Sequence, residues 1–112
     1  MKYLLFTYRD PTVALSPQQR ATVPGLVEAW CDEMDARGVR LQGHVLAALD
    51  DAVVIREREG ALSVTRGPLS EATLQIAGFN ILECASLDEA IEIAAANPGA
   101  AFGTLELRPI AE

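Results

Sequence analysis

Apolar residues fill the first segment of the chain without alternating with polar ones. Residues 2–8, KYLLFTY, are apolar or aromatic on both parities, a pattern that predicts a strand buried on both faces. Further apolar runs predict five more strands, with Glu59-Gly60 as the hairpin turn between two of them. These strands are expected at residues 39–47, 52–58, 61–65, 75–84 and 102–109.

Between the first two predicted strands, the spacing of apolar and polar residues becomes that of a helix. Ser16-Pro17 is a helix opening, with serine as the N-cap and proline at the first position. Pro24 lies within the pattern and is expected to break or kink the helix, because proline removes a backbone hydrogen bond. The second half carries an apolar stripe and ends at Gly38. The stripe consists of Leu26, Val27, Trp30, Cys31 and Met34, and Trp30 is expected in the core.

A second helix is predicted near the end of the chain. Ser86 and Glu89 have the spacing of a capping box, in which each side chain accepts a hydrogen bond from the other residue's backbone N–H. Asn97-Pro98-Gly99 ends this helix. Its expected apolar face consists of Leu87, Ala90, Ile91, Ala94 and Ala95.

The order of these elements predicts an α+β fold, ferredoxin-like βαββ(β)αβ, with an antiparallel sheet and both helices on one face. At this length the chain is expected to be one domain, residues 1–112. Two helices cover only one sheet face, yet 2–8 is apolar on both parities, as are Val53 and Ile55 against Val54. We therefore expect a homodimer that packs sheet against sheet.

Charge and composition narrow the class of partner. The net charge of −7 repels a phosphate backbone, so nucleic-acid binding is not expected. No apolar run reaches the roughly 18 residues of a membrane helix, and the first residues do not resemble a signal peptide. A cytoplasmic location without membrane contact is therefore expected. The sequence has no phosphate loop or dinucleotide fingerprint, and no cofactor is expected.

The cysteines and the acidic residues do not form a metal site in the sequence. Cys31 and Cys84 have no CxxC or histidine partner at ligand spacing, and we interpret them as free thiols in preference to a disulfide or a nucleophile. Acidic residues gather along the first helix without a histidine, which is typical of a solvated face. These are Glu28, Asp32, Glu33 and Asp35.

His44 is the candidate for acid–base chemistry, because it is the only histidine and its ordinary pKa lies near neutrality. It follows Gly43, and a glycine in a strand often allows a bulge or the close approach of a ligand. The alternative is a strand histidine that bonds a carbonyl or solvent. Asp50 and Asp51 would orient His44 only if the intervening loop folds back.

Three further residues are candidates for binding a substrate. Arg66 lies at a Gly-Pro corner and is a candidate anchor for an anion or phenolate, with Glu71 beside it. A partly exposed Arg66–Glu71 ion pair explains the same residues without function. Tyr8 closes the first strand, where it either lines a cleft or belongs to the core.

The whole chain resembles the YCII-related family, in particular its DGPF-domain branch of the dimeric α+β barrel superfamily. The shared features are the MKYLLFTY opening, an ARGV turn, the corner RGPLSE at 66–71, AGF at 77–79 and the closing LELRP. Two residues depart from the DGPF motif, with Arg66 in place of its aspartate and Leu69 in place of its phenylalanine. A Lys-Glu pair usual after the motif's glutamate is Thr73-Leu74 here.

The resemblance implies mostly the fold, a dimer and a cleft. Relatives are thought to use a His–Asp pair near the first helix, and this chain has no histidine there. Superfamily analogy supports one hypothesis, a cofactor-free lyase or isomerase that binds a small anionic or phenolic molecule. The other hypothesis is a non-catalytic regulatory or assembly module, because family members often accompany extracytoplasmic-function sigma factors. The residues do not decide between an enzyme and a module.

Overall fold

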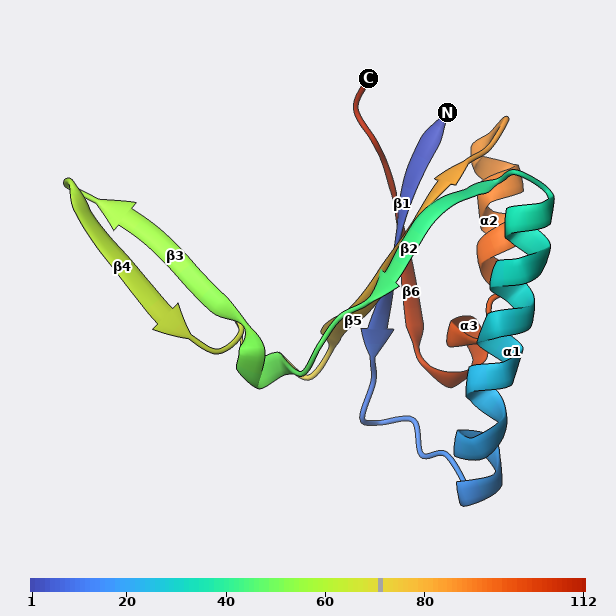
Figure 1. The fold of residues 1–112 in the computed structure, drawn as a ribbon, viewed down its shortest axis with the longest axis horizontal. Coiled ribbons are helices and arrows are strands. Elements are labelled where there is room, and N and C mark those ends of the chain that lie inside the picture. Colours follow the sequence, from blue (N-terminus) through green and yellow to red (C-terminus); the bar gives the residue numbers. More distant parts are fainter. Residues whose placement is uncertain (71) are drawn as a thin grey trace.

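The computed structural model spans residues 1–112 and describes residues 1–70 and 72–112. These residues form six strands and three α-helices, together with a short 3-10 helix, η1 (Figure 1). The strands are β1 Lys2–Arg9, β2 Arg40–Val45, β3 Val53–Arg58, β4 Ala61–Arg66, β5 Gln75–Glu83 and β6 Thr104–Pro109. The helices are α1 Pro17–Ala36, η1 Leu49–Asp51, α2 Leu87–Ala95 and α3 Gly99–Phe102.

Four strands form one antiparallel sheet in the order β2-β5-β1-β6. This is the strand order of a ferredoxin-like fold, so the predicted fold class is confirmed. The helices α1, α2 and α3 all lie on one side of the sheet (Figure 1). The sequence predicted this placement for α1 and α2, where it follows from two right-handed crossovers, and did not predict α3.

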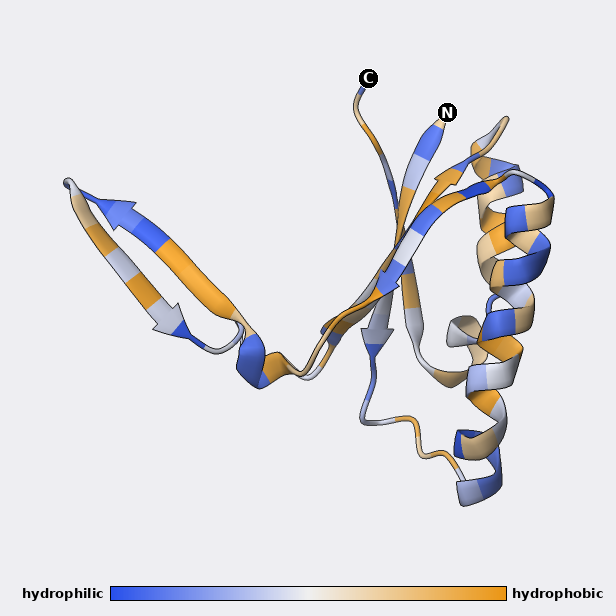
Figure 2. Cartoon of the chain, viewed as in Figure 1, coloured by the Kyte–Doolittle hydropathy of each residue, from blue (hydrophilic) through white to orange (hydrophobic). Residues whose placement is uncertain are grey.

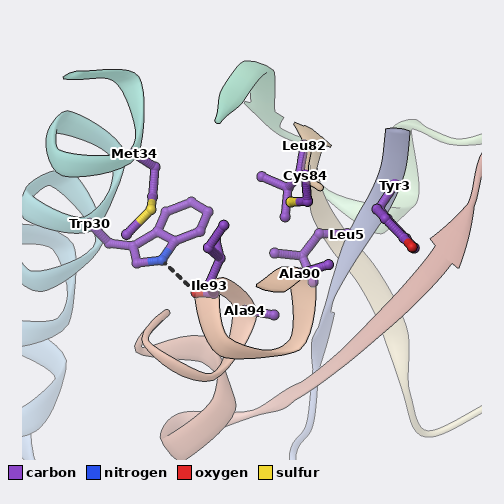
Figure 3. Close-up of a cluster of buried hydrophobic side chains, with 9 residues drawn as sticks. All are labelled: Tyr3, Leu5, Trp30, Met34, Leu82, Cys84, Ala90, Ile93 and Ala94. Atoms are coloured by element: carbon purple, nitrogen blue, oxygen red, sulfur yellow. Dashed lines mark hydrogen bonds between the residues drawn. The ribbon is translucent and has the colours of Figure 1, made fainter. Parts of the chain in front are cut away.

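The helix side of the sheet holds the core. Tyr3 and Leu5 of β1 are buried there against side chains from β5, α1 and α2 (Figure 3). Trp30 of α1, 4% exposed, donates its indole N–H to the carbonyl of Ile93 at 3.0 Å and so joins the two long helices. The rest of the cluster is Met34, Leu82, Cys84, Ala90, Ile93 and Ala94.

Within the part of the chain that the structure describes, no helix lies on the other side of the sheet, which is called the open face here (Figure 1). Because side chains alternate along a strand, the neighbours of buried Tyr3 and Leu5 point to this side. Phe6 lies there between its partners Phe79 of β5 and Glu106 of β6. The open face consists of Leu4, Phe6, Tyr8, Gln42, His44, Phe79, Ile81, Glu106 and Arg108.

Strands β3 and β4 leave the sheet and form a separate two-stranded hairpin, called the arm here. The arm projects on the side of the sheet opposite the helices (Figure 1). Its turn is the predicted one, because Glu59 and Gly60 have φ of 53° and 78°. Val53, Val54 and Ile55, which the sequence analysis assigned to the sheet, lie in this arm instead.

The expected break at Pro24 does not occur, because α1 runs without interruption from Pro17 to Ala36. Pro24 lacks the N–H that would bond the carbonyl of Arg20. Both residues are exposed on the surface of α1, so water can reach that carbonyl. The predicted end is correct, since Gly38 has φ 72° just after the helix.

The helix caps differ from the prediction in detail. Ser86 accepts a hydrogen bond from the Glu89 N–H, but the reciprocal bond, from the Ser86 N–H to the Glu89 carboxylate, is not formed. A complete capping box occurs instead at Ser16 and Gln19 of α1. The predicted apolar face of α2 is only partly right. Ile93 is buried, whereas Leu87 and Ile91 are each about half exposed, because α2 meets the sheet through the turn that holds Ala90 and Ile93.

Candidate ligand-binding cleft

A cavity of about 730 Å³ lies between α1 and the helix side of the sheet. Its walls come from β1, β2 and β5, from α1 and α3, and from the loop that joins β1 to α1. Val23, Val27 and Cys31 form the α1 wall, each one turn after the last. The cavity is of the size that holds a small organic molecule.

Arg40 at the start of β2 is held in this cavity by two partners. Its Nη1 bonds both carboxylate oxygens of Asp35, at 3.0 and 3.1 Å. Its Nε donates to the Asn80 side-chain oxygen at 2.8 Å, across the β2–β5 pair. Only 17% of the Arg40 side chain is exposed. The guanidinium is therefore a positive charge with a fixed orientation at the cavity wall.

Gly43 makes room for this pair of side chains. A Cβ at Gly43 would lie 2.1 Å from Asn80 Oδ1 and 2.7 Å from Arg40 Nη2. The side chains of Arg40 and Asn80 thus lie directly over the Gly43 backbone, on the cavity side of β2. From the sequence, a bulge or the close approach of a ligand was expected at this glycine, whereas the groups that lie against it in the structure are these two side chains.

The rim of the cavity carries more polar groups. Arg9 and Arg20 line it beside Asp10, in a chain whose net charge is −7. The Thr12 hydroxyl and backbone N–H both donate to the Asp10 carboxylate, and with a weaker bond from Thr104 they hold its pKa below the ordinary value. Asp10 is thus a carboxylate at neutral pH, tied to its own loop.

The Cys31 thiol in the cavity wall is not activated. Burial raises its pKa above the ordinary value, and the nearby carboxylates of Asp35, Asp32 and Glu28 add to the effect, although Arg40 opposes it. Cys84 is likewise free, and burial raises its pKa in the core. Because the thiolate is the nucleophile, both cysteines are structural at neutral pH.

Of the sequence-predicted site residues that the structure describes, Tyr8 and His44 are among the residues that border this cavity and Arg66 is not, but the side chains of Tyr8 and His44 point away from it. His44 points to the open face, since its ring lies 5.7 Å from that of Phe79 and its Nε2 lies 3.0 Å from Gln42 Nε2. Gly43, one residue earlier, faces the cavity, so His44 borders it through its backbone. Arg66 is exposed at the base of the arm, and Glu71 lies outside the described residues.

Tyr8 also points to the open face. Its hydroxyl donates to Glu106 Oε1 at 2.6 Å, and its ring lies 6.3 Å from that of Phe6. The hydrogen bond to the Glu106 carboxylate, with desolvation, raises the pKa of Tyr8 above its ordinary value. Tyr8 and His44 therefore share the open face, and neither side chain reaches Arg40.

Sequence reasoning missed Arg40, Asn80 and Arg20 as site residues. Arg40 and Asn80 are 40 positions apart, and only the β2–β5 register brings them together. Among residues 1–70 and 72–112, no group of three or more His, Cys, Asp or Glu side chains is placed to hold a metal ion. In the same residues, no helix is long and apolar enough to cross a membrane.

Comparison with known proteins gives a family and a relative. The family model of the YCII-related domain matches residues 1–112. The chain is also similar to "Uncharacterized protein R00369" of Rhizobium meliloti (strain 1021). The two are 39% identical over 128 aligned residues, which cover 99% of this chain and 93% of the relative.

Proposed function

The chain belongs to the YCII-related domain family, and from that premise we propose that it binds a small organic anion in the cleft between α1 and the sheet. The observation that supports this is Arg40, which Asp35 and Asn80 hold at the cavity wall. Its Nη2 lies over Gly43 and forms no hydrogen bond with another described residue. Two N–H donors of that nitrogen are thus available to a carboxylate or phenolate.

The chemistry of the rest of the cleft fits the same class of ligand. Arg9 and Arg20 at the rim add positive charge in a protein that is otherwise acidic. Val23, Val27 and Phe102 supply apolar surface for a carbon skeleton. A mostly apolar cavity with a few fixed polar groups is the usual form of a small-molecule site.

Binding is better supported than catalysis in this cleft. A lyase or isomerase needs a group that transfers a proton, and the His44 side chain points to the opposite face of the sheet. Asp10 is engaged by Thr12, and the Cys31 thiol stays protonated. We therefore assign the cleft a binding role and keep His44 as the acid–base candidate of the open face.

We also propose the DGPF branch of the family and a homodimer that packs through the open face. Gly67 has φ 105° and donates its N–H to the Ala52 carbonyl at 2.7 Å, which supports a structural role for the Gly-Pro corner. Leu4, Phe6, Phe79 and Ile81 are half-buried on the open face and present apolar surface to a partner.

A thermal-shift and calorimetry screen of small carboxylates and phenols tests the binding role. A ligand at 100 times its dissociation constant should stabilise the native protein by about 2.7 kcal/mol. We expect Arg40→Gln to weaken its binding at least tenfold, because a charge-assisted bond is lost. Arg37→Gln is the matched control and should bind normally, because Arg37 is an exposed arginine at the C-terminal end of α1, outside the cavity lining.

Two results would contradict the proposal. If no member of the panel binds, or if Arg40→Gln binds as well as Arg37→Gln, the cleft is not an anion site. If instead His44→Ala abolishes binding while Arg40→Gln preserves it, the ligand site lies on the open face. Turnover of the bound compound by the wild-type protein would add a reaction to the binding role.

A further inference from the structure

The arm has two chemically different faces. In its register Ile55 pairs with Val64 and Glu57 with Leu62, so one face carries Val53, Ile55, Leu62 and Val64. These four side chains are 48–69% exposed, and the apolar stretches are visible along both strands (Figure 2). The opposite face is mostly polar. It carries Val54, Arg56, Arg58, Ala61, Ser63 and Thr65.

An arm of this kind is poorly stable without a partner surface. A two-stranded hairpin alone in water is marginal, and four exposed aliphatic side chains on one ribbon favour association. Among the described residues the arm stands apart from the sheet, and its two strands pair only with each other. The apolar face of the arm therefore needs a surface from another molecule.

Charge favours a second copy of this chain as that molecule. The arm, residues 52–67, holds three arginines and two glutamates, which gives it a net charge of +1. Because the whole chain has a net charge of −7, the rest of the chain carries −8. A positive arm is attracted to the acidic body of another copy. The same body repels an anionic membrane surface or a nucleic acid.

The position of the arm also favours a second copy of this chain as its partner. It extends from the side of the sheet on which the open face lies, away from the helices (Figure 1). The open face is apolar at Leu4, Phe6, Phe79 and Ile81 and carries Glu106 and Arg108 at its edge strand. The apolar face of the arm also carries one acidic and one basic residue, Glu57 and Arg66. The apolar face of the arm and the open face therefore each combine apolar side chains with one acid and one base.

We propose that the apolar face of the arm packs on the open face of a second copy, so that two copies clasp each other with reciprocal arms. This inference rests on the homodimer proposed above and adds the arm as the element that holds it. A two-fold axis makes both contacts identical, and each dimer covers two arms and two open faces. It also explains how an amphipathic ribbon outside the core can persist.

The test compares two neighbouring residues of β4 that lie on opposite faces of the arm. Val64→Glu places a charge on the apolar face, and Ser63→Glu adds the same charge on the polar face. Sedimentation velocity across a micromolar concentration series measures the dimer dissociation constant of each. We expect Val64→Glu to raise it at least tenfold and Ser63→Glu to leave it within about twofold, the scale of one buried hot-spot residue.

The outcomes of this test separate the clasp from the homodimer. Fluorescence of Trp30, which lies in the core away from the arm, reports whether each variant is folded. A wild-type protein that remains a monomer overturns both the homodimer and the clasp. A dimer that Val64→Glu does not weaken, or that both variants weaken equally, overturns the clasp and leaves the homodimer. Ligand binding in the cleft is measured separately and depends on neither result.

Discussion

Gly43 has no room for a side chain, because the side chains of Arg40 and Asn80 fill the space that a Cβ atom would take. We predict that Gly43→Ala destabilises the protein by about 1–3 kcal/mol, the usual cost of overpacking, and weakens anion binding. The new methyl group would meet Asn80 Oδ1, which must move and release the Arg40 Nε–H bond. Urea unfolding and calorimetry measure the two effects.

The control for Gly43→Ala is another glycine of the same chain. A Cβ at Gly25 in α1 would meet no atom within 4 Å, so Gly25→Ala should stabilise the protein by about 0.5–1 kcal/mol through helix propensity. If Gly43→Ala behaves like Gly25→Ala, the Arg40–Asn80 pair can move without cost, and Arg40 does not have a fixed orientation.

At the scale of residues, local chemistry was predictable and long-range pairing was not. Glu59-Gly60 and Gly38 were recognised because turns and helix ends depend on the φ preference of glycine at one position. The Arg40–Asn80 pair depends on the register between β2 and β5, with a shift between Arg40 and Gln42 that no local pattern encodes. The side-chain direction of His44 follows from the same register, so its place on the open face also had to come from the structure.

At the scale of elements, α1 passes through Pro24 with one backbone hydrogen bond missing. We predict that Pro24→Ala stabilises the protein by about 1–3 kcal/mol, because alanine restores an N–H that can bond the Arg20 carbonyl. Urea unfolding followed by helical circular dichroism measures the change. Pro17→Ala is the matched control, since proline at the first helical position has no N–H bond to lose.

A stabilisation of Pro24→Ala no larger than that of Pro17→Ala would contradict this prediction. It would mean that α1 is shaped around Pro24, next to the Val23 and Val27 side chains that line the cleft. Ligand affinity of the Pro24→Ala variant then shows whether that shape serves binding.

The elements themselves were largely predictable from hydrophobic period and turn residues. All six strands and both long helices lie where the apolar runs and caps placed them, with ends shifted by a few residues. The break expected at Pro24 was wrong because it rested on the low helix propensity of proline, which is a local preference. The packing of Trp30 and Met34 in the core holds α1 in place. The arm misled because a ribbon with an uncovered apolar face has the same sequence pattern as a strand of the sheet.

At the scale of the whole molecule, the core and the cleft are built without the arm. The core cluster comes from β1, β5, α1 and α2 and their flanking residues, and Arg40, Asn80 and Gly43 belong to β2 and β5. The two ends of the arm are already adjacent, because the Gly67 N–H bonds the Ala52 carbonyl at 2.7 Å. A short linker can therefore join them at little cost in loop entropy.

We predict that replacing residues 53–66 by a short Gly-Ser turn leaves a folded body that still binds the cleft ligand but dimerises more weakly. The urea midpoint of Trp30 fluorescence, measured at low protein concentration, should stay near the wild-type value, because Trp30 packs on Ile93 and not on the arm. Loss of the cooperative transition would instead make the arm part of the folding unit. Loss of ligand affinity alone would mean that the cleft takes its final shape only in the dimer, and the open face and the cleft would then act as one site.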